Sequence, residues 1–96
     1  YKKEIPAYVY SEYAQTIFFK EGKIFSAAVN KALEVALAKS PTNPIALTLK
    51  GINHFEAGDL SLAKISWEEA IKYSNNETEK RSIQTAIDSI KSIKNQ

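Results

Sequence analysis

The fold is decided by residues 44–76, PIALTLKGINHFEAGDLSLAKISWEEAIKYSNN. On both sides of the Gly58-Asp59 pair, apolar residues recur every three or four positions, which is the spacing of an amphipathic helix. Glycine readily adopts the left-handed conformation that ends a helix, and aspartate is a preferred N-cap for the next one. The stretch therefore predicts two helices, at 44–57 and 60–73, joined by a tight turn.

Six residues of this stretch fall at the spacings of a tetratricopeptide (TPR) repeat, a helix-turn-helix unit of about 34 residues. They are Leu47, Gly51, Gly58, Ala63, Trp67 and Ala70. Gly51 and Ala63 are small where the two helices must approach closely, and the bulk of Leu47 and Trp67 fills the seam between them. The stretch is therefore interpreted as one complete repeat.

Working outward, turn signals at Gly22-Lys23, at 40–44 and at 74–76 divide the rest of the chain into three more helices. They are expected at 7–21, 25–39 and 77–94. Asn43 and Pro44 have the chemistry of an N-cap and a first helical residue. The prediction is an all-α fold, a right-handed TPR superhelix in a single domain spanning 1–96. Repeat one covers about 7–42, repeat two about 43–76, and a C-terminal capping helix about 77–95.

The first repeat is a looser copy, with two extra residues expected in its second helix or in the turn before that helix. The buried stripe of the 25–39 helix is expected to comprise Ala28, Val29, Ala32, Leu33, Ala36 and Leu37. The last helix carries its stripe at Ile83, Ala86, Ile87, Ile90 and Ile93. Because the final repeat of an array would otherwise leave its apolar face in water, we expect this helix to close the array. Asn76 and Glu79 have the spacing of a capping box at its start.

Composition excludes several classes of protein. The 96 residues contain 13 Lys+Arg, 11 Asp+Glu and no Cys, so no disulfide framework or thiolate metal site is possible. A net charge of +2 is too small to indicate nucleic-acid binding. No run approaches the roughly 20 apolar residues of a membrane span, and the first residues lack the apolar core of a signal peptide. Since the chain begins at Tyr1, we expect an excised domain or a mature chain.

No constellation of residues indicates catalysis. His54 is the single histidine and has no second His or Cys with which to bind a metal, so it is expected to pack or to be partly exposed. Glu68 and Glu69 are adjacent on a helix and diverge. The serines lack a nucleophile-elbow context. The sequence therefore predicts a protein that is not an enzyme, with no catalytic residue, metal or cofactor.

A peptide groove is the predicted site, because the first helix of each TPR repeat lines the concave face. The predicted peptide-binding residues are Glu12, Thr16, Phe19, Lys20, Thr48, Ile52, Phe55 and Glu56, with Val9 and Ile45 as further candidates. An amphipathic helix would pack on Phe19, Ile52 and Phe55, oriented by Lys20 and Glu56 at the rim. The alternative is that Phe19 and Phe55 pack against the capping helix. A clamp for a C-terminal carboxylate is not expected, because its positions hold Glu12, Thr16 and Leu49.

The run at 46–70, ALTLKGINHFEAGDLSLAKISWEEA, resembles the periplasmic TPR module of bacterial cytochrome c biogenesis proteins. These are haem lyase accessory subunits of the CcmI/CycH and NrfG type, the latter concerned with nitrite reductase assembly. The Phe18-Phe19 pair and the cap segment 82–87, SIQTAI, also carry the resemblance, which covers about 8–93.

This resemblance implies a non-catalytic periplasmic domain, soluble and part of a membrane-anchored or secreted protein. It would bind the C-terminal segment of an apocytochrome c while other haem lyase subunits attach haem at Cys-x-x-Cys-His. The implied partners are that segment and those subunits, with no nucleic acid and no direct haem binding. The alternative hypothesis is a general TPR scaffold for another multiprotein complex.

Overall fold

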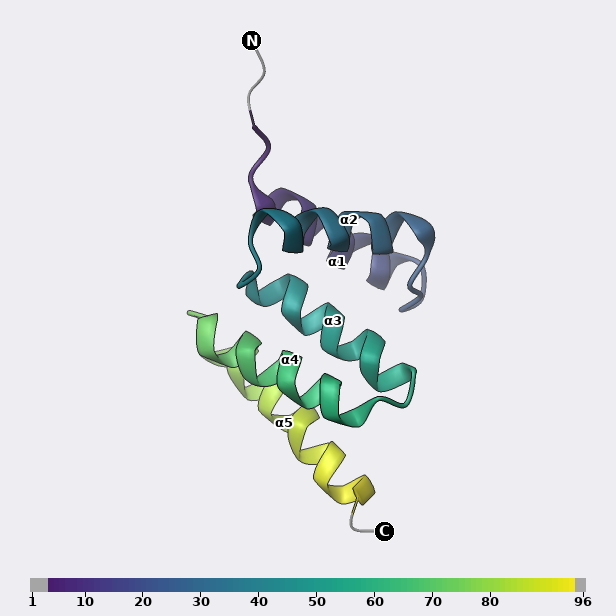
Figure 1. Cartoon of the computed structure of the whole chain (residues 1–96), viewed down its shortest axis with the longest axis vertical. Coiled ribbons are helices and arrows are strands. Elements are labelled where there is room, and N and C mark those ends of the chain that lie inside the picture. Colours follow the sequence, from purple (N-terminus) through teal and green to yellow (C-terminus); the bar gives the residue numbers. More distant parts are fainter. Residues whose placement is uncertain (1–3, 95–96) are drawn as a thin grey trace.

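The computed structural model describes residues 4–94, which form five α-helices and no strand (Figure 1). The helices are α1 (Ala7–Lys20), α2 (Ala27–Lys39), α3 (Pro44–Glu56), α4 (Leu60–Tyr73) and α5 (Glu77–Lys94). The all-α prediction is confirmed. Residue 95 of the predicted capping helix lies outside the described residues.

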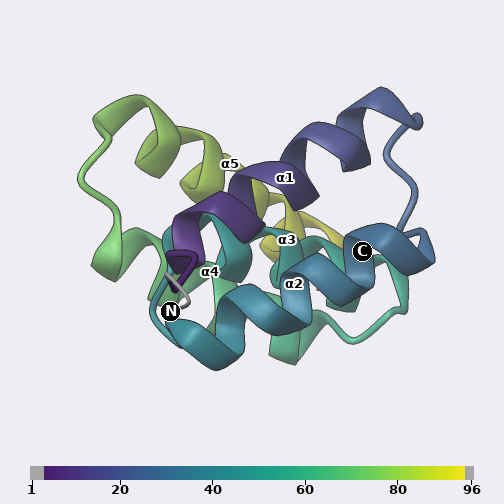
Figure 2. The same ribbon diagram turned by 90° about the horizontal axis from the view of Figure 1, so that it is seen from above.

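The helices form a stack along the longest dimension of a 56 × 27 × 20 Å molecule. Helices α1 and α2 form one antiparallel hairpin and α3 and α4 a second, while α5 packs on α4 (Figure 1). Helix α3 also contacts both helices of the first hairpin. Seen from above, α1 and α5 lie on the same side of the stack (Figure 2), and along its length α3 lies between them (Figure 1). Among residues 4–94, no helix is both long and apolar enough to cross a membrane.

Two matching turns close the hairpins. The N–H of Lys23 donates to the Phe18 carbonyl at 2.7 Å and that of Gly22 donates to the Phe19 carbonyl at 3.3 Å. After α3, the Asp59 N–H donates to the His54 carbonyl at 2.9 Å, and the Gly58 N–H donates to the Phe55 carbonyl at 3.0 Å. Both are Schellman motifs, and both glycines adopt positive φ, at 82° and 85°. The role predicted for Gly58 is therefore confirmed.

The turn before α2 is three residues longer than the turn before α4, whereas α2 is one residue shorter than α4, so the net excess of two residues in the first hairpin comes from the turn and not from the helix. Helix α2 begins at Ala27, two residues later than expected, because the Ser26 hydroxyl accepts a hydrogen bond from the Val29 N–H at 3.3 Å. In the second hairpin one residue, Asp59, serves both helices. Its N–H belongs to the turn that closes α3, and its side chain caps α4 by accepting a hydrogen bond from the Leu62 N–H at 3.2 Å. Asn43 caps α3 through the Ala46 N–H at 2.9 Å, as predicted.

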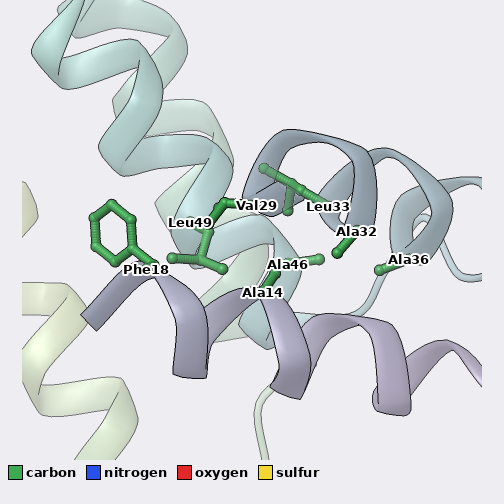
Figure 3. Packing of buried hydrophobic residues seen from close by; sticks show 8 residues of the cluster. All are labelled: Ala14, Phe18, Val29, Ala32, Leu33, Ala36, Ala46 and Leu49. Carbon is green, nitrogen blue, oxygen red and sulfur yellow. The ribbon is translucent and has the colours of Figure 1, made fainter. Parts of the chain in front are cut away.

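Two hydrophobic clusters hold the helices together, and α3 contributes to both. The first lies between α1, α2 and α3 (Figure 3). It consists of Ala14, Phe18, Val29, Ala32, Leu33, Ala36, Ala46 and Leu49. Ala28, expected in this core, is exposed: it lies in the first turn of α2, on the side away from α3, and lines a surface hollow between α1 and α2. That part of the predicted stripe was wrong.

The second cluster joins α3, α4 and α5, and its members are Leu47, Ala63, Trp67, Ala70, Ile83, Ile87 and Ile90. A β-carbon at Gly51 would overlap the indole of Trp67, which is 4% exposed. The indole N–H donates to the Thr48 carbonyl at 3.1 Å. The seam predicted from Gly51 and Trp67 is therefore present, with a hydrogen bond that satisfies the buried indole nitrogen.

Helix α5 starts at a cap that differs from the predicted capping box. The Asn76 side chain accepts from the Glu79 N–H at 2.9 Å, but the Glu79 carboxylate does not bond back to the Asn76 N–H. Instead the buried Ser74 hydroxyl accepts a hydrogen bond from the Asn76 N–H at 3.1 Å. The same hydroxyl donates to the Glu79 carboxylate at 2.8 Å. Ile93, expected in the apolar stripe, is 44% exposed, because α5 has 18 residues against 14 in α4 and its last turn runs past its neighbour.

Candidate groove between α1 and α3

The predicted groove residues of α3 lie on the helix that occupies the centre of the stack, beside α1 (Figure 2). Between the C-terminal ends of these two helices there is a hollow of about 340 Å³, lined by Phe18, Phe19, Lys23, Ile52 and Glu56. Three of the predicted binding residues, Phe19, Ile52 and Glu56, therefore meet at one place. They come from different repeats, so the hollow exists only because α3 packs on α1.

Phe19 is the most available apolar side chain of this hollow, with 53% of its surface exposed. Its ring meets the buried Phe18 ring edge-on, with the centroids 5.4 Å apart. Phe18 in turn packs against Phe25, with the centroids 4.7 Å apart. Such contacts fix the orientation of an exposed ring and lower the entropy that it loses when a ligand covers it.

The remaining predicted residues of α3 belong more to the core than to the surface. Phe55 is half-buried against the second cluster, with its ring centroid 5.8 Å from that of Trp67. The isoleucines of α5 belong to the same cluster, but the ring contact of Phe55 is with Trp67 of α4, so packing of Phe55 against the capping helix stays a prediction. Thr48 is half-buried, and its hydroxyl donates to the Pro44 carbonyl at 2.7 Å. Ile52 contacts both clusters and still lines the hollow.

On α1, Glu12, Thr16 and Lys20 are exposed but do not line the hollow. Val9, a further candidate, lines the hollow between α1 and α2, so its placement in the groove was wrong. Ile45 is half-buried against the first cluster and does not line the groove hollow either. The predicted set thus divides into a contiguous part around Phe19, a half-buried part on α3 and an exposed part spread along α1.

Lys23 is the residue that the sequence interpretation missed. It directly follows Gly22 and has a positive φ of 64°, and its ammonium lies 6.0 Å from the Phe19 ring centroid, within reach of a cation–π interaction. The signal was present in the sequence, because the residue that follows a helix-ending glycine bonds back to the last turn of that helix.

Within residues 4–94, the charged side chains around the hollow take part in no ion pair. Among residues 4–94, the pairs within 4.0 Å join Lys31 to Glu34, Lys39 to Glu4 and Lys80 to Glu77, at 3.8, 3.4 and 3.4 Å. Lys20, Lys23 and Glu56 take part in none of them. The hollow thus has an apolar floor, a cation on its α1 wall and a carboxylate on its α3 wall.

A larger hollow of about 440 Å³ lies between α1 and α2, on the side away from α3. Ile5, Val9 and Tyr13, which are 42–51% exposed, line it. When Gly22 is aligned with Gly58, Val9, Tyr10 and Tyr13 take the places of Ile45, Ala46 and Leu49, which pack against the first hairpin. This face therefore has the pattern of a surface on which hairpins stack, and it was not among the predicted sites.

The single histidine lies apart from the groove hollow. In the part of the chain that the structure describes, no three His, Cys, Asp or Glu side chains gather where they could hold a metal ion. His54 is half-buried, as expected, and lines a separate hollow between α2, α3 and α4 with Leu37 and Leu62. Lys50, Ser66 and Glu69 also line that hollow.

No protein-family model, curated protein or solved structure matches the chain. Its function is therefore inferred from its own residues.

Proposed function

We propose that the chain is a two-repeat TPR module that binds a segment of another protein in the groove between α1 and α3. The observation that carries the proposal is the hollow in which Phe19, Ile52 and Glu56, chosen as binding residues from their repeat positions, come together. Hollows that combine an exposed aromatic ring, an aliphatic floor and rim charges suit an amphipathic helix laid into a groove.

Four features of the chain support the TPR assignment. The two hairpins have the same Schellman turn, α3 packs on both helices of the preceding hairpin, and the close contact of Gly51 with Trp67 joins the helices of the second hairpin. A final helix packs on α4 and covers the apolar face of the second hairpin. Each is the arrangement expected when repeats stack only on their neighbours.

The C-terminal segment of an apocytochrome c is the first ligand to test, because the sequence resemblance implies it. Isothermal titration of the whole chain with such peptides should give saturable binding. Phe19→Ala should weaken binding by about 2 kcal/mol or more, roughly 30-fold, if Phe19 is the central anchor. Tyr73→Ala is the matched control: this aromatic is 40% exposed on α4 and does not line the groove hollow.

Phe19 is a better probe than Phe55, because truncation of a ring that packs on Trp67 would also change stability. Equal binding by the wild type and the Phe19→Ala variant would remove the groove from the proposal. Absence of binding by every peptide would refute the function and leave the general scaffold as the remaining hypothesis.

A further inference from the structure

We infer that the groove selects a segment in which a bulky apolar side chain has an acidic residue on one side and a basic residue on the other. The inference rests on the proposed function and names the chemistry of the ligand. In the bound state the acidic residue faces α1 and the basic residue faces α3.

The charges on the two walls of the hollow carry this inference. Lys23, in the turn that follows α1, and Glu56, on α3, line the same hollow as Phe19 and Ile52. The exposed Lys20 adds a second cation to the same end of α1. A ligand of one sign would be attracted by one wall and repelled by the other, whereas a ligand with both signs meets opposite charge on each side.

These charges are available to a ligand. Lys23 and Glu56 are both exposed, and neither is among the ion pairs formed by residues 4–94. Lys23 and Glu56 line the same hollow without forming an ion pair with each other. A helix seated there presents side chains about four positions apart on one face, so the apolar residue and its charged neighbours belong at that spacing.

The Lys23 ammonium lies close to the Phe19 ring, 6.0 Å from the ring centroid. The Lys23 N–H is held by the Phe18 carbonyl at 2.7 Å. The backbone that carries the charge is therefore tied to the end of α1. The apolar ligand residue would cover the Phe19 ring. An acidic side chain next to that residue would then lie close to the Lys23 ammonium.

The test uses the whole chain and four short alanine-based helical peptides, each labelled for fluorescence anisotropy. All contain one central Leu, and the residues about four positions before and after it are Glu and Lys, two Glu, two Lys, or two Gln. The wild type should bind the mixed-charge peptide most tightly. The two-Gln peptide should come next, and the two single-sign peptides should come last.

Charge reversal on the protein should switch this order. Lys23→Glu should make the two-Lys peptide the tightest ligand, and Glu56→Lys should do the same for the two-Glu peptide. Each switch should be roughly three- to tenfold in affinity and should shrink as salt is raised, since exposed charges are screened. Lys72→Glu and Glu69→Lys are the matched controls, because they change net charge at exposed positions of α4 and should leave the order as in the wild type.

The possible outcomes distinguish failure of the charge selectivity from failure of the proposed binding function. If no peptide binds the wild type, the two-Gln peptide included, the proposed function fails for these ligands and the selectivity fails with it. If all four peptides bind equally and neither reversal changes their order, the groove stands and the selectivity is overturned. A switch produced equally by the α4 control variants would show an effect of net charge and would also overturn it.

Discussion

Replacement of Gly51 by alanine should destabilise the protein, although alanine is the better helix former. Gly51 lies inside α3, where an exposed glycine-to-alanine change stabilises a helix by about 1 kcal/mol. Here the added β-carbon would overlap the indole of Trp67. The sign of the effect therefore tests how closely α3 and α4 pack.

The structure gives a rough magnitude. Overpacking of a well-filled core costs about 1–3 kcal/mol. Displacement of the indole also breaks the 3.1 Å hydrogen bond from its N–H to the Thr48 carbonyl. Loss of a buried donor's partner costs about 1–3 kcal/mol. After subtraction of the helix-propensity gain, Gly51→Ala should lower the free energy of unfolding by about 3 kcal/mol, which for a chain of this size lowers Tm by about 10–20 °C.

Urea denaturation followed by both circular dichroism and fluorescence measures the change, and Trp67 is the single tryptophan, so the emission reports on this seam. Asn53→Ala is the control, because it adds helix propensity at an exposed position of the same helix and should stabilise by about 0.5 kcal/mol. In a Trp67→Leu background the Gly51→Ala change should cost at least about 2 kcal/mol less. A Gly51→Ala protein more stable than the wild type would refute the close contact of the two helices.

Three further substitutions test other parts of the fold by the same denaturation assay. Ser74→Ala should cost about 1–2 kcal/mol, because it removes the buried hydroxyl that bridges two groups at the start of α5, whereas the exposed Ser89→Ala should change stability by less than about 0.5 kcal/mol. Lys23→Gly should stabilise by about 0.5–1 kcal/mol, since it relieves a positive φ of 64°, and a loss of stability would contradict that conformation. Ile87→Ala should cost about 3 kcal/mol and Ile93→Ala less than about 1 kcal/mol, because they are 3% and 44% exposed; equal losses would contradict the placement of the cap helix.

Helix boundaries were predictable where a single residue decides them through local chemistry. Asn43 and Asp59 cap the helices that follow them, and Gly58 takes the left-handed conformation at the expected place. The start of α2 was placed two residues early, because apolar periodicity extended the helix back to Phe25 while the Ser26 hydroxyl holds its first turn. Ser26 is itself an N-cap residue, so this error came from weighting periodicity above capping chemistry.

Which face of a helix is buried was less predictable, because it depends on neighbours that the repeat pattern does not specify. Ala28 continues the periodicity of the α2 stripe but lies on the side where no hairpin stacks. Val9 has an apolar side chain on α1 and faces that same open side instead of the groove. Periodicity identifies an apolar face of a helix, and the position of the hairpin within the stack determines whether another helix covers that face.

Phe19 and Phe55 show why the groove was predicted only in part. They occupy the same place in the two repeats when Gly22 is aligned with Gly58, yet Phe19 is 53% exposed whereas Phe55 is half-buried. The second repeat has Trp67 and the cap-helix isoleucines beside its phenylalanine, while in the first repeat Phe18 and Phe25 fill the core and leave Phe19 outside. Equivalent positions thus differ in how much of their ring they expose. Under the proposed function, a ligand would meet the available aromatic ring at the end of α1, beside Lys23, and the strongest effects of mutation on binding should lie at that end.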